Sequence, residues 1–292
     1  MKKKSGLKAL LLGAALLMSL AAALVWDSRY NLQLSRYELS FESLPESFEG
    51  YKILHLSDLH GMSFGQGNSR LVDAIKSQQP DMIAFTGDIA GKDGELSAVE
   101  SLLEGIEGLA PAYYVNGNHE WADGCTGRIE AMMESYGVSC LSNEIELLYQ
   151  GDDSIVIIGA EDPNGRADMM KPWELSRKAG ELYSGKFMLW LAHRNDYIKM
   201  YPDIGTDLIL CGHAHGGIIR LPFIGGLLNV QRSWGAEYEC GVYRTEHYLM
   251  EVSRGLGNSI PIPRLFNRPE IVLIAVSYTH LRAHETLRPL VC

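Results

Sequence analysis

Short apolar runs, bounded by polar and glycine-rich segments, recur along most of the chain. Runs of this length that are apolar at nearly every position are typical of buried strands rather than of helices. The runs that we interpret in this way are Tyr51–Ser57, Asp81–Thr86, Ala112–Val115, Phe187–Ala192 and Leu208–Cys211. Segments with helical spacing of apolar positions follow or precede them, at 68–79, 95–109, 128–136, 172–183 and 196–201. This alternation predicts an α/β fold.

Further strands are predicted outside this series. Ile145–Tyr149 and Ser154–Ala160 flank a Gly-Asp-Asp turn signal, and Gly241–Thr245 and Tyr248–Ser253 have the pattern of a hairpin. Ile271–Val276 is predicted as the last strand. Residues 27–49 are polar, so we interpret them as a linker with one candidate strand at Tyr37–Phe41.

The N-terminus is apolar over a length that could span a bilayer. Lysines at positions 2, 3, 4 and 8 precede the run Ala9–Trp26, which is close to the roughly 20 residues of a transmembrane helix. The lysines should stay in the cytoplasm, so the rest of the chain should lie outside a single-pass cell-membrane anchor. The alternative is a signal peptide with an Ala-x-Ala cleavage site at Ala21–Ala23, which would yield a secreted protein.

These patterns divide the chain into four parts. Residues 1–26 are the anchor or signal segment, 27–49 the linker and 50–276 one globular domain. Residues 277–292 resemble translated adapter sequence, and we interpret them as a non-native tail. Two histidines and one cysteine in that tail are therefore excluded from the candidate site.

Charge and cysteine content exclude two classes of protein. The 292 residues carry a formal net charge of −10 without a long basic run, which argues against a general nucleic-acid binder. Five cysteines are widely spaced, without a Cys-x-x-Cys pair, so the sequence does not predict a disulfide scaffold. An anionic substrate remains compatible with this charge if metal ions supply the positive charge at the site.

Residues with metal-ligating side chains directly follow the apolar runs. After Leu208–Cys211, His213 and His215 stand two residues apart, and in an extended segment such residues point to the same side. The other strand ends carry Asp58, His60, Asp88, Asn118 and His193. Asp58, Asp88 and Asn118 are spaced by 30 residues, about the length of a βαβ unit. We therefore expect them at the carboxyl ends of neighbouring parallel strands, where open α/β sheets place their sites.

Seven such side chains exceed what one metal ion needs. If Asp88 is shared, they can hold two ions, and a two-ion site can clamp the attacking and leaving oxygens of a displacement at phosphorus. Two dications with two carboxylates and one bridging hydroxide retain one positive charge. That charge favours a bound phosphate and the charge that develops in its transition state.

Five motifs in order resemble those of the calcineurin-like metallophosphoesterases. They are Asp58-Leu59-His60, Gly87-Asp88, Gly117-Asn118-His119-Glu120, His193 and Gly212-His213-Ala214-His215. With the apolar N-terminus, the segments 192–196, 216–217 and 253–257 resemble most the membrane-anchored bacterial phosphodiesterases of the YaeI/YkuE type. The resemblance covers residues 50–276. It implies a four-layer α/β/β/α sandwich of two facing mixed sheets, here preceded by one transmembrane helix.

The resemblance also implies residue roles. A first metal ion would be held by Asp58, His60 and His215, a second by Asn118, His193 and His213, and Asp88 would bridge them. His119 would be catalytic, orienting the phosphate or protonating the leaving oxygen.

Three further residues have two interpretations each. Glu120 either polarises a metal ligand from behind or is an ordinary loop carboxylate. Arg194 and Arg254 either contact substrate phosphate or are solvated at the surface.

The implied activity is that of a dinuclear metal-dependent phosphoester hydrolase. It would be a phosphodiesterase or pyrophosphatase for a lipid or cell-envelope phosphate compound, acting by in-line attack of metal-bound hydroxide. A phosphomonoesterase and a non-catalytic metal-bound envelope scaffold are the alternatives. Mixed oxygen and nitrogen donors favour two divalent ions of Mn, Fe or Zn over Ca. The expected partners are a phosphate-containing small molecule or lipid and the membrane; nucleic acid is not expected, and no protein partner is evident.

Two apolar loops and two single residues also have open interpretations. Leu221–Leu228 and Ile260–Phe266 form either a lipid-facing lip beside the site or ordinary packed loops. His55, inside its strand, is interpreted as a core histidine or one that supports a ligand. Cys211 is interpreted as a packing residue rather than a ligand.

Overall fold

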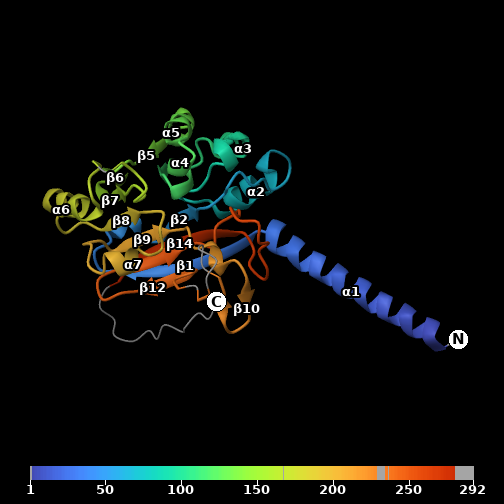
Figure 1. The fold of residues 1–292 in the computed structure, drawn as a ribbon. Helices are drawn as coiled ribbons and strands as arrows, with labels where there is room; N and C mark the ends of the chain where they lie inside the picture. Colours follow the sequence, from blue (N-terminus) through green and yellow to red (C-terminus); the bar gives the residue numbers. More distant parts are fainter. Residues whose placement is uncertain (1, 167, 229–233, 236, 280–292) are drawn as a thin grey trace.

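Two six-stranded sheets face each other, with helices on their outer faces (Figure 1). The computed structural model describes residues 2–166, 168–228, 234–235 and 237–279. The first sheet has the order β1 (Gln33–Phe41), β14 (Glu270–Tyr278), β2 (Tyr51–Leu56), β3 (Met82–Thr86), β4 (Ala112–Val115) and β5 (Val138–Cys140). The second has the order β12 (Gly241–Arg244), β13 (Leu249–Val252), β9 (Leu208–Cys211), β8 (Met188–Leu191), β7 (Asp153–Gly159) and β6 (Glu144–Gln150).

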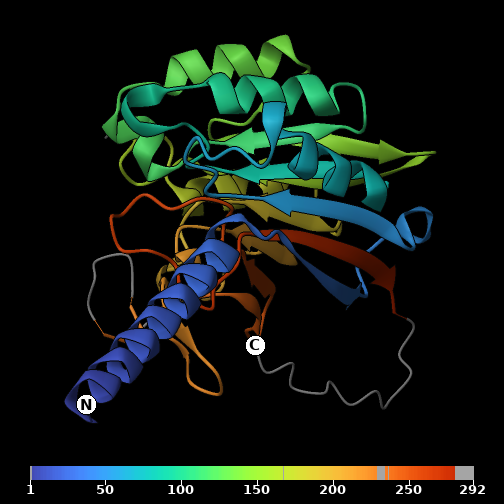
Figure 2. The same cartoon turned by 90° about the vertical axis from the view of Figure 1, so that its right-hand side faces the viewer.

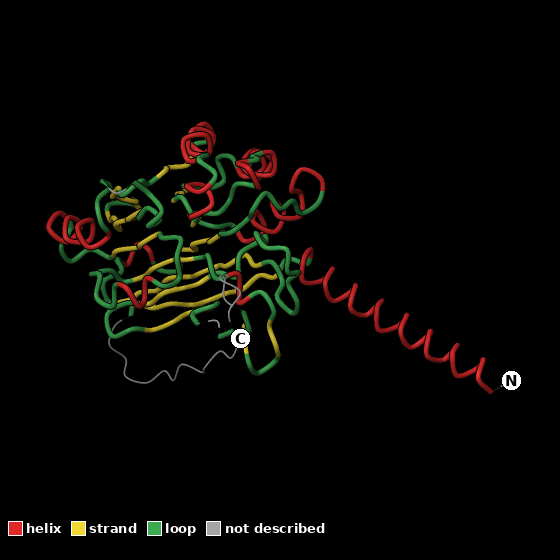
Figure 3. Tube along the Cα trace, viewed as in Figure 1, coloured by secondary structure: helices red, strands yellow, loops and turns green. Residues whose placement is uncertain are grey.

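Both sheets are mixed and their helices lie outside (Figure 3). Strands β2 to β5 run parallel, as do β7, β8, β9 and β13, whereas β14–β2, β6–β7 and β12–β13 are antiparallel. The longer helices are α2 (Ser69–Gln78), α3 (Ser97–Ile106), α5 (Thr126–Ser135) and α6 (Pro172–Leu182), and the short ones are α4 (Asn118–Ala122) and α7 (Tyr197–Met200). A small hairpin, β10 (Arg220–Leu221) and β11 (Gly225–Gly226), stands apart from the sheets.

Three apolar cores separate the four layers. In β3, Ile83 and Phe85 pack toward the helices of the first sheet, whereas Met82 and Ala84 lie in the core between the sheets. In β9, Leu208 and Leu210 lie in that middle core, and Cys211 packs under the helices of the second sheet. Strands buried on both faces need apolar residues at every position. The predicted four-layer α/β/β/α sandwich is therefore confirmed.

The segment predicted as a linker contributes a strand to the first sheet. β1 pairs in parallel with β14 over nine residues, beginning four residues before the predicted strand. Leu39 and Phe41 are buried in the middle core, and the polar residues that alternate with them, Glu38 and Ser40, are exposed. This period-two pattern is that of an edge strand with one buried face, and its polar exposed positions made the segment resemble a linker.

The ends of other predicted elements also differ. α4 and β5 are too short to show a period in the sequence, and neither was predicted. The last strand runs to Tyr278, where its register still pairs Ser277 with Ser40. It therefore extends two residues into the segment interpreted as a tail, and residues 280–292 lie outside the described part of the chain.

The N-terminal helix α1 (Lys2–Tyr30) projects from the body of the molecule (Figure 2). Its segment Leu10–Tyr30 has a mean hydropathy of 2.0, which is long and apolar enough to cross a membrane. A signal sequence would have the same properties. At its end, Asp27 accepts two hydrogen bonds from the guanidinium of Arg268, at 2.7 and 2.8 Å, so the helix is joined to the globular domain.

The middle core predicts where stability is most sensitive. Leu210→Ala would remove a fully buried side chain between the sheets and should lower the free energy of unfolding by about 2–5 kcal/mol. Leu182→Ala, at an exposed position on α6, should change it by less than about 0.5 kcal/mol. Denaturant unfolding of the full chain in detergent measures both, and equal midpoints for the two variants would contradict the assignment of this core.

Candidate metal centre

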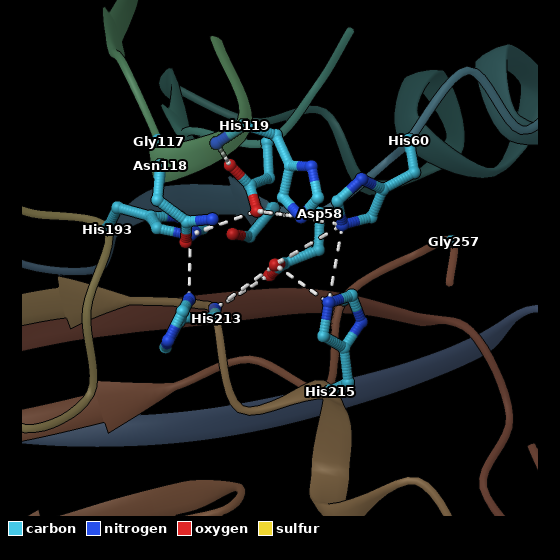
Figure 4. A network of polar contacts seen from close by, with 12 residues as sticks. Asp58, His60, Gly117, Asn118, His119, His193, His213, His215 and Gly257 are labelled. Atoms are coloured by element: carbon cyan, nitrogen blue, oxygen red, sulfur yellow. Dashed lines mark hydrogen bonds and ion pairs between the residues drawn. The ribbon is translucent and has the colours of Figure 1, made fainter. Parts of the chain in front are cut away.

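Five strands end at the same edge of the sandwich, and the candidate residues follow them there (Figure 4). β2, β3 and β4 of the first sheet and β8 and β9 of the second all present their carboxyl ends to this edge. The side chains that the structure brings together are Asp58, His60, Asp88, Asn118, His119, His193, His213 and His215. All seven predicted ligands and the predicted catalytic histidine therefore share one site.

The backbone reaches this site through tight turns, not through extended segments. Asp58, His60, Asp88, His213 and His215 all have left-handed backbone conformations, with φ between 47° and 67°. The expectation that His213 and His215 lie in an extended segment and point to the same side is wrong. Such conformations cost about 1–3 kcal/mol each and persist where surrounding contacts hold them. Here main-chain hydrogen bonds join the loop after β2 to the loop after β3, from Asp58 N to Gly87 O and from His60 N to Asp88 O, each 3.0 Å long.

The turns distribute the side chains over two groups. The first, the Asp58 group, consists of Asp58, His60 and His215. His60 Nε2 lies 3.3 Å from His215 Nε2, and His215 Nε2 lies 3.5 Å from Asp58 Oδ1. The second, the His193 group, consists of Asn118, His193 and His213, and His213 Nδ1 lies 3.2 Å from His193 Nε2. The Asn118 Oδ1 atom is 3.1 Å from the same His193 nitrogen. His213 and His215 thus belong to different groups.

Asp88 lies between the two groups. Its Oδ1 atom accepts a hydrogen bond of 2.8 Å from the main-chain N–H of His119. Its Oδ2 atom is 3.2 Å from His193 Nε2 and 3.7 Å from His60 Nε2. One carboxylate oxygen therefore faces both groups, which is the position that a bridging ligand requires.

The donor set fits metal ions. Burial lowers the pKa of His60 to about 4 and that of His213 to about 3, so both imidazoles are neutral, which is the form that ligates metals. In the Asp58 group, the neutral Nε2 atoms of His60 and His215 face each other 3.3 Å apart, where their lone pairs repel unless a proton or cation lies between them. The ligand atoms of the Asp58 group, and those of Asp88, His193 and His213, each lie within 4.8 Å of one another.

The charges of Asp58, Asp88 and His193 shift one another's pKa. Burial raises the pKa of Asp58 to about 6. Burial opposes ionisation of Asp88 as well, but the neighbouring histidines hold its pKa well below the usual range. Burial likewise opposes the charged form of His193, yet Asp88 raises its pKa to about 10. The Nδ1–H of His193 donates to Thr86 O at 2.7 Å, which orients Nε2 toward the site, as in many metal-ligating histidines.

Glu120 organises two of the loops. Its fully buried carboxylate accepts four main-chain hydrogen bonds, from Asp88, Ile89, Ala90 and Gly117, at 2.7–3.0 Å. Burial raises the pKa of this carboxyl to about 7, which the four N–H donors counteract. Of the two interpretations, an ordinary loop carboxylate is excluded, because Glu120 ties the turn after β3 to the turn after β4.

Glycines allow these turns to approach each other. A Cβ at Gly117 would overlap Asp88 Oδ1, and a Cβ at Gly212 would overlap Asp58 Oδ2. At Gly255, whose φ is 70°, an added Cβ would lie only 2.5 Å from Asp58 Cβ. The motif glycines are thus required by close packing around the two carboxylates.

His119 differs from the other histidines in its exposure. Its side chain is 40% exposed, compared with 7% for His60 and 0% for His193. Its ring packs edge-on against His60, with centroids 4.9 Å apart, and its Nε2 is 3.9 Å from Asp88 Oδ2. It therefore lies at the mouth of the site, where it can contact an incoming group.

The two candidate arginines have carboxylate neighbours. Arg194 donates two hydrogen bonds to the buried Asp162, at 2.7 and 3.0 Å, and Arg254 Nε lies 3.6 Å from Glu270. A third arginine, Arg264, was missed in the sequence. It is buried and donates to Gly255 O and Gly257 O at 2.9 and 2.8 Å, so it shapes the loop that packs on Asp58. Its only sequence signal was a lone charge in an apolar loop.

His55 supports the site from the space between the sheets. Its Nδ1 is 2.6 Å from Glu251 Oε2, and its Nε2 is 2.7 Å from Thr86 Oγ1. Thr86 also accepts the hydrogen bond of His193. His55 thus lies behind the candidate ligand His193, in keeping with its interpretation from the sequence as a core histidine or one that supports a ligand.

The role of Glu120 predicts a loss of stability on amide substitution. In Glu120→Gln the amide NH2 would face main-chain N–H donors, so we expect the free energy of unfolding to fall by about 2–4 kcal/mol. Glu104→Gln, at an exposed position on α3, is the matched control. Denaturant unfolding checks both, and indistinguishable midpoints would show that the four hydrogen bonds do not hold the loops.

Comparison with known proteins identifies the group to which these motifs belong. Residues 51–217 match the calcineurin-like phosphoesterase family. The chain is 27% identical over 254 residues to the uncharacterized metallophosphoesterase YkuE of Bacillus subtilis, covering 85% of this chain and 87% of YkuE. It is 29% identical over 249 residues to the phosphodiesterase YaeI of Escherichia coli, covering 83% and 87%.

A vertebrate relative and a solved structure extend the comparison. A transmembrane protein with a metallophosphoesterase domain from Danio rerio is 27% identical over 262 residues, covering 82% of this chain and 56% of that protein. The sulfate thiohydrolase SoxB of Thermus thermophilus, solved with glycerol, shares the fold with a TM-score of 0.50 at 14% identity, over 80% of this chain and 57% of that one. Since the family match spans more than half of the chain, this protein belongs to the calcineurin-like metallophosphoesterases, which hydrolyse phosphoesters at a two-metal site.

Proposed function

We propose that this chain is a membrane-anchored phosphodiesterase or pyrophosphatase that acts on a lipid or cell-envelope phosphate compound. The observation that carries the proposal is the Asp88 carboxylate, whose Oδ2 atom lies between the Asp58 group and the His193 group. The similarity to YaeI, a phosphodiesterase, supports cleavage of a diester rather than a monoester.

The residue roles follow from the two groups. Asp58, His60 and His215 would hold one divalent ion, Asn118, His193 and His213 the other, with Asp88 shared by both. Ions of Mn, Fe or Zn suit these donors. When bound, two such ions supply positive charge that neutralises the oxygens of a transferring phosphoryl group.

His119 is proposed to act on the leaving group. Hydrolysis joins a water oxygen to phosphorus and breaks the bond from phosphorus to the leaving oxygen, which must take up a proton. His119 is the exposed histidine of the cluster, and the bond from its main-chain N–H to Asp88 Oδ1 fixes its position. Its imidazole is therefore placed to donate a proton to the leaving oxygen as a general acid.

The topology is part of the same proposal. The lysines before the apolar segment of α1 would remain in the cytoplasm, which places the catalytic domain outside the cell membrane. Release of a secreted form by cleavage at Ala21–Ala23 is the alternative.

Removal of the shared carboxylate should abolish metal binding and activity together. In Asp88→Asn the neutral amide cannot serve both groups, so we expect loss of at least one ion and a decrease in kcat of about 10³-fold or more. Metal content by mass spectrometry, and hydrolysis of a chromogenic phosphodiester by Mn-loaded protein, measure the two effects. Retention of both ions by Asp88→Asn would contradict the bridging role.

His119→Ala should separate metal binding from turnover. We expect unchanged metal content and a decrease in kcat of about 10²–10⁴-fold, the usual contribution of a general acid. The decrease should be largest for poor leaving groups, which need the proton most. Undiminished hydrolysis in this variant would refute the assigned role. Absence of phosphodiester hydrolysis by the Mn-loaded wild type would favour the monoesterase or scaffold alternatives.

The anchor makes a prediction about fractionation. We expect the full chain to remain in the membrane fraction after a carbonate wash. In cells whose inner membrane is intact and whose outer envelope layers, if present, have been opened, an externally added protease should cleave the catalytic domain. A soluble mature form beginning near Leu24 would instead establish a cleaved signal peptide.

A further inference from the structure

A cleft leads from the candidate metal centre to the end of the N-terminal helix. It has a volume of about 360 Å³, and its lining includes His60 of the site, Arg29 of α1 and apolar side chains on both sides. The apolar lining comes from Val25, Met62, Leu256, Ile260 and Ile262. The cleft thus connects a phosphate-binding site to a segment that is apolar enough to cross a membrane.

The wall opposite α1 is a formed loop. The side-chain amide of Asn258 donates to Ile260 O and Ile262 O at 3.0 and 2.8 Å, which fixes the turn that carries these apolar residues. Arg264 holds the base of the loop through Gly255 O and Gly257 O. Gly257 in turn donates from its main chain to Asp58 O at 2.6 Å, so the wall is attached to the metal centre itself. Figure 4 shows Gly257 on the His60 side of the site.

The other wall is fixed as well. The ion pair between Asp27 and Arg268, and a main-chain bond of 2.8 Å from Gln33 N to Pro269 O, hold the end of α1 against the domain. The apolar segment of α1 ends at Tyr30, and Val25 and Arg29 lie in its last turns. The mouth of the cleft is therefore at the level where the helix would leave the bilayer.

The charge of the cleft favours an anionic amphiphile. The chain as a whole has a net charge of −10, but the described residues that line the cleft include two arginines and no carboxylate. With Arg29 at its mouth and apolar walls, the cleft is complementary to a phosphate attached to a hydrocarbon chain.

A second apolar feature lies on the same side of the domain. In Figures 1 and 2 both α1 and the β10–β11 hairpin extend below the two sheets. At the tip of the hairpin, Phe223 is 95% exposed and Ile224 is 69% exposed, so ordinary packing does not account for this loop. Exposed large apolar residues of this kind mark contact with a partner or a membrane.

We propose that this cleft binds the hydrocarbon chain of a membrane amphiphile whose phosphoester reaches the metal centre past His60. The substrate class is then a phosphodiester or pyrophosphate with an acyl or polyprenyl chain, entering sideways from the bilayer between α1 and the 256–264 loop. This inference rests on the proposed function, and it adds the place where the lipid part binds.

The test compares two substrates that differ only in their tail. Methyl p-nitrophenyl phosphate and hexadecyl p-nitrophenyl phosphate have the same reacting centre and leaving group, and both are offered to the Mn-loaded full chain in nanodiscs. Partition into the bilayer alone would favour the hexadecyl ester, so the informative quantity is the change in the ratio of the two kcat/KM values in cleft variants. In Ile262→Trp, which fills the cleft, we expect this ratio to fall by at least about 10-fold. Leu182→Trp, an equal enlargement at an exposed site on α6, should leave it unchanged.

Arg29 provides a variant that does not threaten the fold, because its side chain is exposed. Arg29→Glu should raise KM for the hexadecyl ester about 10-fold or more, and Arg29→Lys should restore most of the loss. If Ile262→Trp and Arg29→Glu both leave the ratio of kcat/KM for the hexadecyl and methyl esters at the wild-type value, the proposed role of the cleft is refuted, while the hydrolase function stands. If neither ester is hydrolysed by the wild type, the proposed function fails instead.

Photolabelling then tests the cleft without turnover. A dodecyl phosphate with a terminal diazirine should label peptides containing residues 25–29 or 256–264, and Ile262→Trp should reduce this labelling. Labelling confined to the earlier turns of α1, as expected for any bilayer-exposed helix, would overturn the proposal.

Discussion

The site depends on the placement of one buried carboxylate, Asp88, between histidines from both sheets. Its Oδ1 atom accepts the main-chain N–H of His119, and its Oδ2 atom is left facing His60 and His193. A buried anion is costly unless opposite charge or hydrogen bonds compensate it, and here the neighbouring imidazoles hold its pKa well below the usual range. The same compensation would be provided by metal ions, so the geometry that stabilises Asp88 also suits it to bind them.

A rigid frame keeps this carboxylate in place. Glu120 gathers four N–H groups from the turns after β3 and β4, and glycines let these turns come within a distance that no side chain would permit. Behind them, the His55–Glu251 pair joins the two sheets and reaches Thr86, which orients His193. The two sheets are thus connected by polar contacts at the point where both must contribute residues to one site. Such supporting contacts set the precision of a metal centre as much as its ligands do.

The relation of the site to α1 adds a second constraint. The ion pair between Asp27 and Arg268 holds the end of the helix next to the loop that Arg264 shapes. Fixed in this position, the helix forms one wall of the cleft beside His60.

The sequence by itself determined the α/β class and the residues of the site, and its resemblance to the family implied the four layers. Runs of four to seven mostly apolar residues specify strands buried on both faces, and His, Asp and Asn after those runs specify metal-ligating side chains at one edge. The resemblance to the family implied how these side chains divide between two groups, but only the tertiary structure decided the backbone turns that divide them. His213 and His215 are neighbours in the sequence, but left-handed turns direct them into different groups, and local spacing cannot encode a turn that contacts from other loops hold. The role of Glu120, the pairing of Arg194 with Asp162 and the parallel pairing of β1 with β14 have the same origin, because each depends on a partner distant in the chain.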